Sequence, residues 1–129
     1  MDDPIEGLLF VTIHIRDIKR THEFYTKVLG LKALSYNEEL QRAVFAIPGT
    51  TTALVAHVKG PDEGGREPGT VSGVTFAHHD PFAACAEIKK RGGTITDEPR
   101  IVERPGGITF TIGVFADPDG NEFVIRKPQ

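Results

Sequence analysis

The chain has 129 residues, 39% of them hydrophobic and 26% charged, which is ordinary for one globular domain and excludes the disordered and membrane classes. Its 18 acidic and 15 basic residues give a formal net charge of -3, and the scattered basic residues exclude a typical nucleic-acid-binding run. The single cysteine, Cys85, cannot form a disulfide within the chain, and the amino-terminal residues lack a signal-peptide pattern. These features predict a soluble cytoplasmic protein without a nucleic-acid or membrane partner.

Residues 8–58 predict a unit made of one strand, one helix and three further strands. The first strand candidate, Leu8–Ile15, reads LLFVTIHI, a β-branched and aromatic run. Asp17 is a good helix N-cap, and Gly30 stands where a helix commonly ends in a left-handed residue. The three strand candidates that follow are Leu31–Tyr36, Arg42–Ile47 and Ala53–Val58.

Residues 71–127 predict a second unit with the same order of elements. The glycine- and proline-rich residues 59–70 separate the two units and have the composition of a linker. Asp17 stands thirteen residues before Gly30, and Asp80 stands twelve before Gly92, so the spacing of helix start and stop repeats. The expected elements of the second unit are the strand Val71–His78, the helix Pro81–Arg91 and the strands Thr94–Asp97, Ile108–Phe115 and Glu122–Lys127.

Residues 117–120, Asp-Pro-Asp-Gly, predict a tight turn before the last strand. Proline presets one backbone dihedral, the aspartates can bond nearby backbone, and glycine tolerates positive φ. A helix-loop-helix calcium loop is excluded, because Glu122 and Pro128 occupy the positions that need glycine and glutamate. Cys85 shares a predicted helix face with Phe82 and Ile88, which indicates a core residue and not a nucleophile.

Taken together, these motifs resemble the vicinal oxygen chelate superfamily, which includes glyoxalase I and the bleomycin-resistance proteins. The resemblance rests on Asp17-Ile18, Phe24-Tyr25, Val28-Leu29-Gly30-Leu31, Gly92-Gly93 and residues 117–121, and it covers nearly the whole chain. It implies an α+β fold of two βαβββ modules whose curved mixed sheets enclose a cavity. It also implies a homodimer.

Enzymes of this superfamily usually hold a divalent ion with four His, Gln or Glu side chains on the first and last strands of both modules. Counting from the helix starts, the fourth strand and the last turn puts these positions at Phe10, Ala56, Gly73 and Val124, none of which can bind a metal ion. Shifting the second position to His57 would turn that side chain out of the cavity if the strand alternates as expected. Because this sequence departs from the superfamily at all four positions, we expect neither a metal ion nor another cofactor.

Strand alternation selects the candidate ligand-binding residues. Thr12 and His14 should share a face with Phe10, and the resemblance implies that a basic residue at position 14 could hold a substrate carboxylate. His14 could equally be a half-buried strand histidine, and Glu122 with Arg126 could be a solvated pair instead of ligand contacts. The predicted set is Phe10, Thr12, His14, Ala56, Gly73, Thr75, Ile112, Val114, Glu122, Val124 and Arg126.

Three functions compete on this evidence. The first is a metal-independent protein that sequesters a small organic molecule in the cavity. The second is a glyoxalase-like or antibiotic-modifying lyase, isomerase or transferase that uses His14 and Glu122 in acid-base catalysis, or an atypical metal site. Such a site would draw on His14, His57, His78 or His79, although adjacent strand histidines should face opposite sides. The third is an interaction module whose own side chains fill the cavity.

Overall fold

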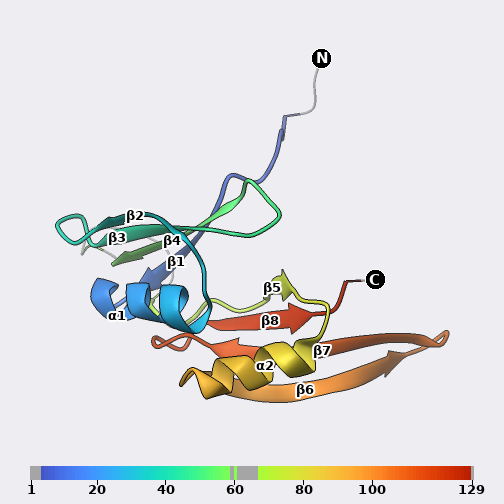
Figure 1. Cartoon of the computed structure of the whole chain (residues 1–129). Helices are drawn as coiled ribbons and strands as arrows, with labels where there is room; N and C mark the ends of the chain where they lie inside the picture. Colours follow the sequence, from blue (N-terminus) through green and yellow to red (C-terminus); the bar gives the residue numbers. More distant parts are fainter. Residues whose placement is uncertain (1–3, 59, 61–66, 129) are drawn as a thin grey trace.

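Two four-stranded mixed sheets form the framework of the protein (Figure 1). The computed structural model describes residues 4–58, 60 and 67–128. The strand orders are β1-β4-β3-β2 in the first sheet and β5-β8-β7-β6 in the second, with the pairs β1/β4 and β5/β8 parallel and the others antiparallel. Within the described ranges, no strand of one sheet pairs with a strand of the other. This is the predicted α+β fold with two modules.

The first module folds from a capped helix between strands, as the sequence predicts. The Asp17 side chain accepts a 3.1 Å hydrogen bond from the Arg20 amide and so begins the helix. After Glu23 the helix continues as a wider, π-helical turn that was not predicted. The elements are β1 (Phe10–Ile15), α1 (Ile18–Glu23), the π-helical turn (Phe24–Val28), β2 (Ala33–Asn37), β3 (Arg42–Ala46) and β4 (Ala53–Val58).

The second module repeats this order with one longer strand. Its elements are β5 (Val74–Ala77), α2 (Pro81–Lys90), β6 (Thr94–Arg104), β7 (Ile108–Ala116) and β8 (Glu122–Arg126). Strand β6 extends beyond the predicted end at Asp97, because residues 100–104 pair with β7 in a long hairpin after an irregularity at residues 98 and 99 (Figure 1). Most of the predicted linker, residues 59 and 61–66, lies outside the described residues. No helix in the described part of the chain is long and apolar enough to cross a membrane.

The hydrophobic core lies on the helix-covered faces of both sheets and joins the two modules. The Tyr25 ring lies 5.2 Å from the Phe45 ring in the first sheet and 6.2 Å from the Phe123 ring in the second, measured between centroids. Both phenylalanines are fully buried. Cys85 is also buried, which confirms its prediction as a core residue. One continuous apolar cluster therefore fixes the modules against each other.

Candidate functional site

The first sheet has an open face, opposite to α1, which carries several of the predicted ligand-binding residues. Phe10, Thr12 and His14 alternate along β1 toward this face, while Ile13 and Ile15 are buried in the core. The Phe10 side chain is exposed, although it is large and apolar. The predicted grouping of these three side chains is therefore found, on a face that a single chain leaves partly open.

The position predicted on β4 was wrong by one residue. Ala56 pairs with Ile13 and Ala43 and is 0% exposed, so it faces the core and not the open face. Val55 occupies the open-face position instead, because it pairs with Thr12. His57 pairs with His14 and shares its face, so the expectation that His57 would turn away is also wrong. The register of the parallel pair, which the sequence does not contain, decides the face.

His14 lies near the carboxyl end of β1 on this face and is only partly exposed. Its ring centroid is 6.3 Å from that of His57, with the rings tilted by 49°. The His14 Nδ1 atom is buried and has no hydrogen-bond partner among the described residues. In the next strand, Arg42 pairs with His57, so three basic side chains form a row across β1, β4 and β3. This row can recognise a polar or anionic group of a ligand.

The second sheet has a corresponding open face, opposite to α2. Val124 pairs with Thr75 on one side and Val114 on the other, and Arg126 pairs with Ala77 and Ile112. These side chains share one face, together with Glu122, while Phe123 and Ile125 are buried on the other. Gly73 immediately precedes β5 with a φ of 88°. The structure thus places the predicted second-module residues on or beside one surface.

Glu122 and Arg126 each have a separate partner on this face. The Glu122 carboxylate accepts a 2.7 Å hydrogen bond from the Thr96 hydroxyl. The Arg126 guanidinium lies 4.3 Å from the centroid of the Phe110 ring, in cation–π geometry. Their two partners orient the side chains at opposite ends of β8. These contacts explain the positions of both side chains without an ion pair between Glu122 and Arg126 and without a bound ligand.

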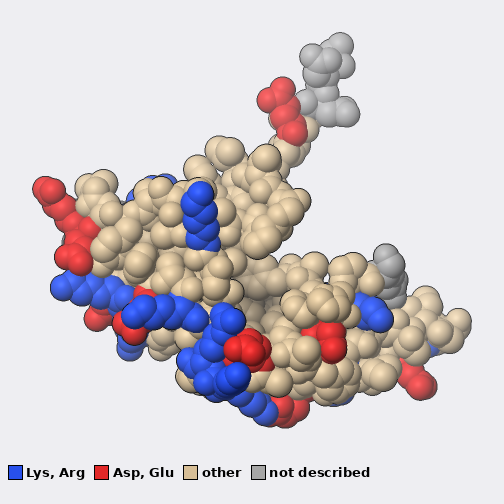
Figure 2. Space-filling view, in the orientation of Figure 1, with Lys and Arg blue, Asp and Glu red and all other residues tan. Residues whose placement is uncertain are grey.

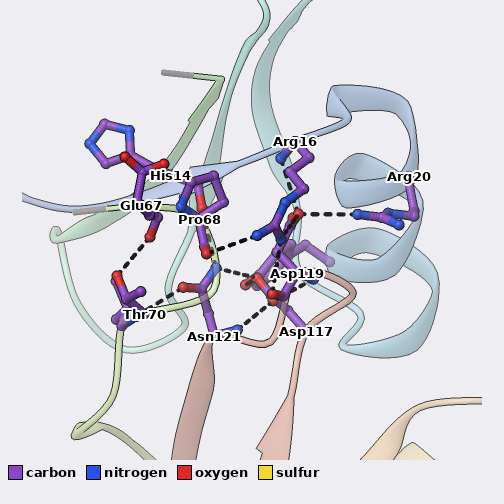
Figure 3. Close-up of polar contacts among 11 residues, drawn as sticks. His14, Arg16, Arg20, Glu67, Pro68, Thr70, Asp117, Asp119 and Asn121 are labelled. Carbon is purple, nitrogen blue, oxygen red and sulfur yellow. Dashed lines mark hydrogen bonds and ion pairs between the residues drawn. The ribbon is translucent and has the colours of Figure 1, made fainter. Parts of the chain in front are cut away.

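A buried polar network joins the two modules directly beside His14 (Figure 3). Asn121 donates from Nδ2 to Asp117 Oδ2 at 2.9 Å and to the His14 carbonyl oxygen at 3.4 Å. Asp119 Oδ1 accepts hydrogen bonds from the side chains of Arg16 and Arg20. The turn of residues 117–120 is therefore structural, as predicted, and it fixes the end of β1 against the second module.

A pocket of about 550 Å³ lies between the modules on the helix side of the second sheet. Figure 2 shows the molecular surface hollowed between the two modules, with mostly uncharged atoms around the hollow. Of the predicted ligand-binding residues, only Thr75 lines this pocket. Its apolar walls come from both modules and include Leu29, Leu31, Ile47, Phe76, Ile88 and Phe115. The cavity inside one chain is thus a different surface from the predicted one.

The positions at which the superfamily places metal ligands do not fit a metal ion in this chain. With Val55 in place of Ala56, the four are Phe10, Val55, Gly73 and Val124, which offer no coordinating side-chain atom. In the described part of the chain, no three His, Cys, Asp or Glu side chains are grouped to hold an ion.

The two adjacent histidines beyond β5 do not face opposite sides. The rings of His78 and His79 stack with centroids 4.5 Å apart. His78 Nδ1 accepts a 2.9 Å hydrogen bond from the Asp80 amide, at the start of α2. The expectation of opposite sides is wrong because β5 ends at Ala77, so strand alternation no longer applies. This pair belongs to the strand-to-helix connection.

Sequence reasoning missed Arg42 and Val55 on the open face, and it considered His57 but expected its side chain to turn away. Arg42 begins β3, and its place on the open face follows only from pairing with His57. A count of alternating residues along one strand could not find it, because the cross-strand register sets which residues become neighbours.

Comparisons with known proteins agree with this architecture. The family model described as Glyoxalase/Bleomycin resistance protein/Dioxygenase superfamily matches residues 7–125. A lactoylglutathione lyase from Escherichia coli O157:H7 is 33% identical over 88% of this chain and 86% of its own.

Two crystal structures also match over almost the whole chain. A member of the same superfamily from Sphaerobacter thermophilus is 27% identical, with a TM-score of 0.80, and the match covers 96% of this chain and 98% of that one. TnmS3, an antibiotic binding protein from Streptomyces sp. CB03234, has a TM-score of 0.80 at 24% identity, covering 99% and 100%.

Proposed function

Because the chain belongs to the Glyoxalase/Bleomycin resistance protein/Dioxygenase superfamily, we propose that it binds a small organic molecule without a metal ion. The observation that carries this proposal is the chemistry of Phe10, Val55, Gly73 and Val124. These residues take the positions of the metal ligands, and their side chains are apolar or absent. We expect a protein with these residues to bind its ligand but to lack the metal ion that acts as a Lewis acid in the enzymes of the superfamily.

The proposed binding site is formed by the open face of the first sheet in one copy and that of the second sheet in another copy. Phe10, Thr12 and Thr75 are exposed on these faces in the single chain. A ligand pocket usually buries most of its ligand, which neither open face can do alone. A homodimer related by a two-fold axis would form two equivalent sites. The same proposal places this dimer in the cytoplasm.

The chemistry of the two faces suits a ligand with an apolar body and a few polar groups. Phe10, Ile112 and Val114 provide apolar contact area. His14, His57 and Arg42 lie at one end of the first face and would orient a polar or anionic group of the ligand. The similarity in fold to an antibiotic binding protein supports sequestration of such a molecule.

A lyase activity is the second candidate, because relatives at 33% identity are lactoylglutathione lyases. The residues that would carry acid-base chemistry without a metal are His14 and Glu122. They lie in different sheets, and Glu122 already accepts a hydrogen bond from Thr96. Catalysis would therefore require the two faces to meet across a dimer.

One binding experiment separates these candidates. Full-length protein is stripped of metal with EDTA, and the binding of bleomycin and of lactoylglutathione is measured by calorimetry, with turnover of lactoylglutathione followed in parallel. Our proposal predicts binding of an organic probe that is the same before and after EDTA treatment, without turnover. A Thr12→Trp variant should weaken this binding by at least about tenfold, equivalent to about 1.4 kcal/mol.

The matched control is Ala86→Trp, which adds the same ring to the exposed side of α2. Equal binding by both variants would contradict the assignment of the open face. Turnover that needs added metal would contradict the metal-independent function.

A further inference from the structure

Two arginines lie over one phenylalanine ring on the open face of the second sheet. The guanidinium carbon of Arg126 in β8 is 4.3 Å from the centroid of the Phe110 ring, and that of Arg104 in β6 is 5.4 Å from it. Phe110 lies in β7, which runs between β6 and β8. We call these three side chains the Arg-Phe-Arg cluster.

Strand pairing brings the cluster together. Phe110 pairs with Val102 in β6, and Arg104 is two residues further along that strand. On the other side of β7, Ile112 pairs with Arg126, so Phe110 is two residues from the partner of that arginine. Side chains in such diagonal positions share a face of the sheet and lie within reach of each other when they are long. Three neighbouring strands of one module therefore build the cluster.

The two guanidinium groups of the cluster have no carboxylate partner within residues 4–58, 60 and 67–128. Other arginines do bind carboxylates, namely Arg16, Arg20, Arg91 and Arg100. The ring of Phe110 attracts both positive charges, but it is no substitute for an oxygen acceptor of their N–H groups. Two like charges over one ring also repel each other. An anion in contact with both would remove this repulsion and accept their hydrogen bonds.

The neighbouring charged residues of β6 do not neutralise the cluster. Arg100 pairs with Ile112 and so lies on the same face, but its side chain bonds to both carboxylate oxygens of Asp97, at 3.4 and 3.2 Å. Glu103, the carboxylate next to the cluster in the sequence, pairs with Thr109 and faces the other side of the sheet. The unbalanced positive charge at this end of the face therefore lies at the cluster.

The chemistry of the cluster and its surroundings defines the group that would bind. A guanidinium presents several N–H donors in one plane, which match two oxygens of a carboxylate or a phosphate. Next to the cluster, Ile112 and Val114 continue the open face as apolar surface. This end of the sheet therefore suits a ligand with an oxyanion at one end and an apolar body.

We propose that Arg104 and Arg126 bind an oxyanion, a carboxylate or phosphate group of the organic ligand, and that Phe110 positions both guanidiniums for it. This assignment rests on the proposed function, because it names one group of the same ligand. All three residues belong to one module, so a small oxyanion can bind to them in a single chain. The anionic end of the ligand then lies at the β6–β7 hairpin, and its apolar body lies over Ile112.

Titration of the full-length protein with three small aromatic probes tests the site. Benzoate and phenyl phosphate each carry an oxyanion, and benzamide is a neutral control of similar shape. The NMR signals of the Arg104 and Arg126 Nε–H groups should shift with at least one of the two anions and not with benzamide. The anion that binds more tightly identifies the class of oxyanion. Shifts at Arg42 alone, or equal shifts with benzamide, would overturn the proposal.

Substitutions separate the cluster from the neighbouring arginine. Arg104→Gln and Arg126→Gln should each raise the Kd of the tighter anion at least about tenfold, because each removes a charge-assisted contact. Arg100→Gln is the matched control and should change the Kd less than about threefold, since its charge is already balanced by Asp97. Equal effects of the three variants would overturn the proposal.

The role of the ring has its own pair of variants. Phe110→Leu keeps both charges but removes the aromatic ring, so it should raise the Kd about threefold, and Phe110→Tyr should keep the wild-type value. The calorimetry with bleomycin tests the proposed function separately. Bleomycin binding without any oxyanion binding would overturn the arginine site alone. Oxyanion binding by a protein that binds neither bleomycin nor lactoylglutathione would support the site and count against the proposed function.

Discussion

The Tyr25 hydroxyl donates a 2.8 Å hydrogen bond to Asp117 Oδ2, and both side chains are buried where the modules meet. Tyr25 lies in the π-helical turn of the first module, and Asp117 begins the turn before β8 in the second. The carboxylate also accepts hydrogen bonds from the amides of Asp119 and Asn121, both at 2.9 Å. One charge-assisted bond therefore links the helix of one module to a hydrogen-bonded turn of the other.

Replacing Tyr25 by Phe should reduce the free energy of unfolding by about 1–3 kcal/mol at neutral pH, because the buried carboxylate loses one donor. Burial, followed by the nearby charge of Asp117, raises the pKa of the Tyr25 hydroxyl well above its usual value. The bond therefore stabilises the protein fully below the unfolded-state pKa of about 10, and its contribution falls as pH rises above that value.

Urea unfolding of both proteins between neutral pH and about pH 11 measures this difference. The wild type should lose stability relative to Tyr25→Phe above about pH 10. A difference that grows with rising pH would contradict the assigned direction.

Replacing Asn121 by Leu should cost about 2–4 kcal/mol of unfolding free energy, because a buried side chain loses three hydrogen bonds together. Asn121 is 0% exposed and accepts from the Val71 amide in addition to its two donations. The matched control is Asn37→Ala, which removes only an exposed bond to the Leu40 amide and should cost about 1 kcal/mol or less. Equal midpoints for the two variants in urea would show that the junction carries no special stability.

The described part of the predicted linker contains one glycine, Gly69, whose replacement should be costly. Gly69 has a φ of 84°, and a Cβ atom there would collide with the Asp119 carbonyl oxygen. Gly49 has a similar φ of 79° but open space around it. Gly49→Ala should cost about 1 kcal/mol from backbone strain alone, and Gly69→Ala should cost clearly more, about 2–4 kcal/mol. Thermal unfolding compares the two, and a smaller loss for Gly69→Ala would be inconsistent with the close approach of Gly69 to Asp119.

The sequence predicts the fold well because local signals repeat in both halves. Asp17 and Asp80 cap the helices as expected, and β4 has the predicted bounds. The end of β6 was wrong because residues 98–104 contain Pro99 and charged residues, and their strand conformation depends on pairing with β7.

The faces of the sheets were harder to predict than their strands. Alternation along β1 and β8 was sufficient for Thr12, His14 and Val124, but β4 required its register against β1. An error of one residue in the register placed Ala56 on the open face instead of Val55, and it turned His57 away from the face that it shares with His14. How the modules pack was also not encoded in any local pattern, so the pocket between them could not be predicted.

Metal content tests the central claim most directly, because it does not depend on knowing the ligand. The protein is produced in cells supplied with Zn, Ni, Mn and Fe, purified without chelators, and measured by mass spectrometry of the elements. Our account predicts far less than one ion per chain, since Phe10, Val55, Gly73 and Val124 offer no coordinating side-chain atom. A content near one ion per chain, retained through dialysis, would contradict it.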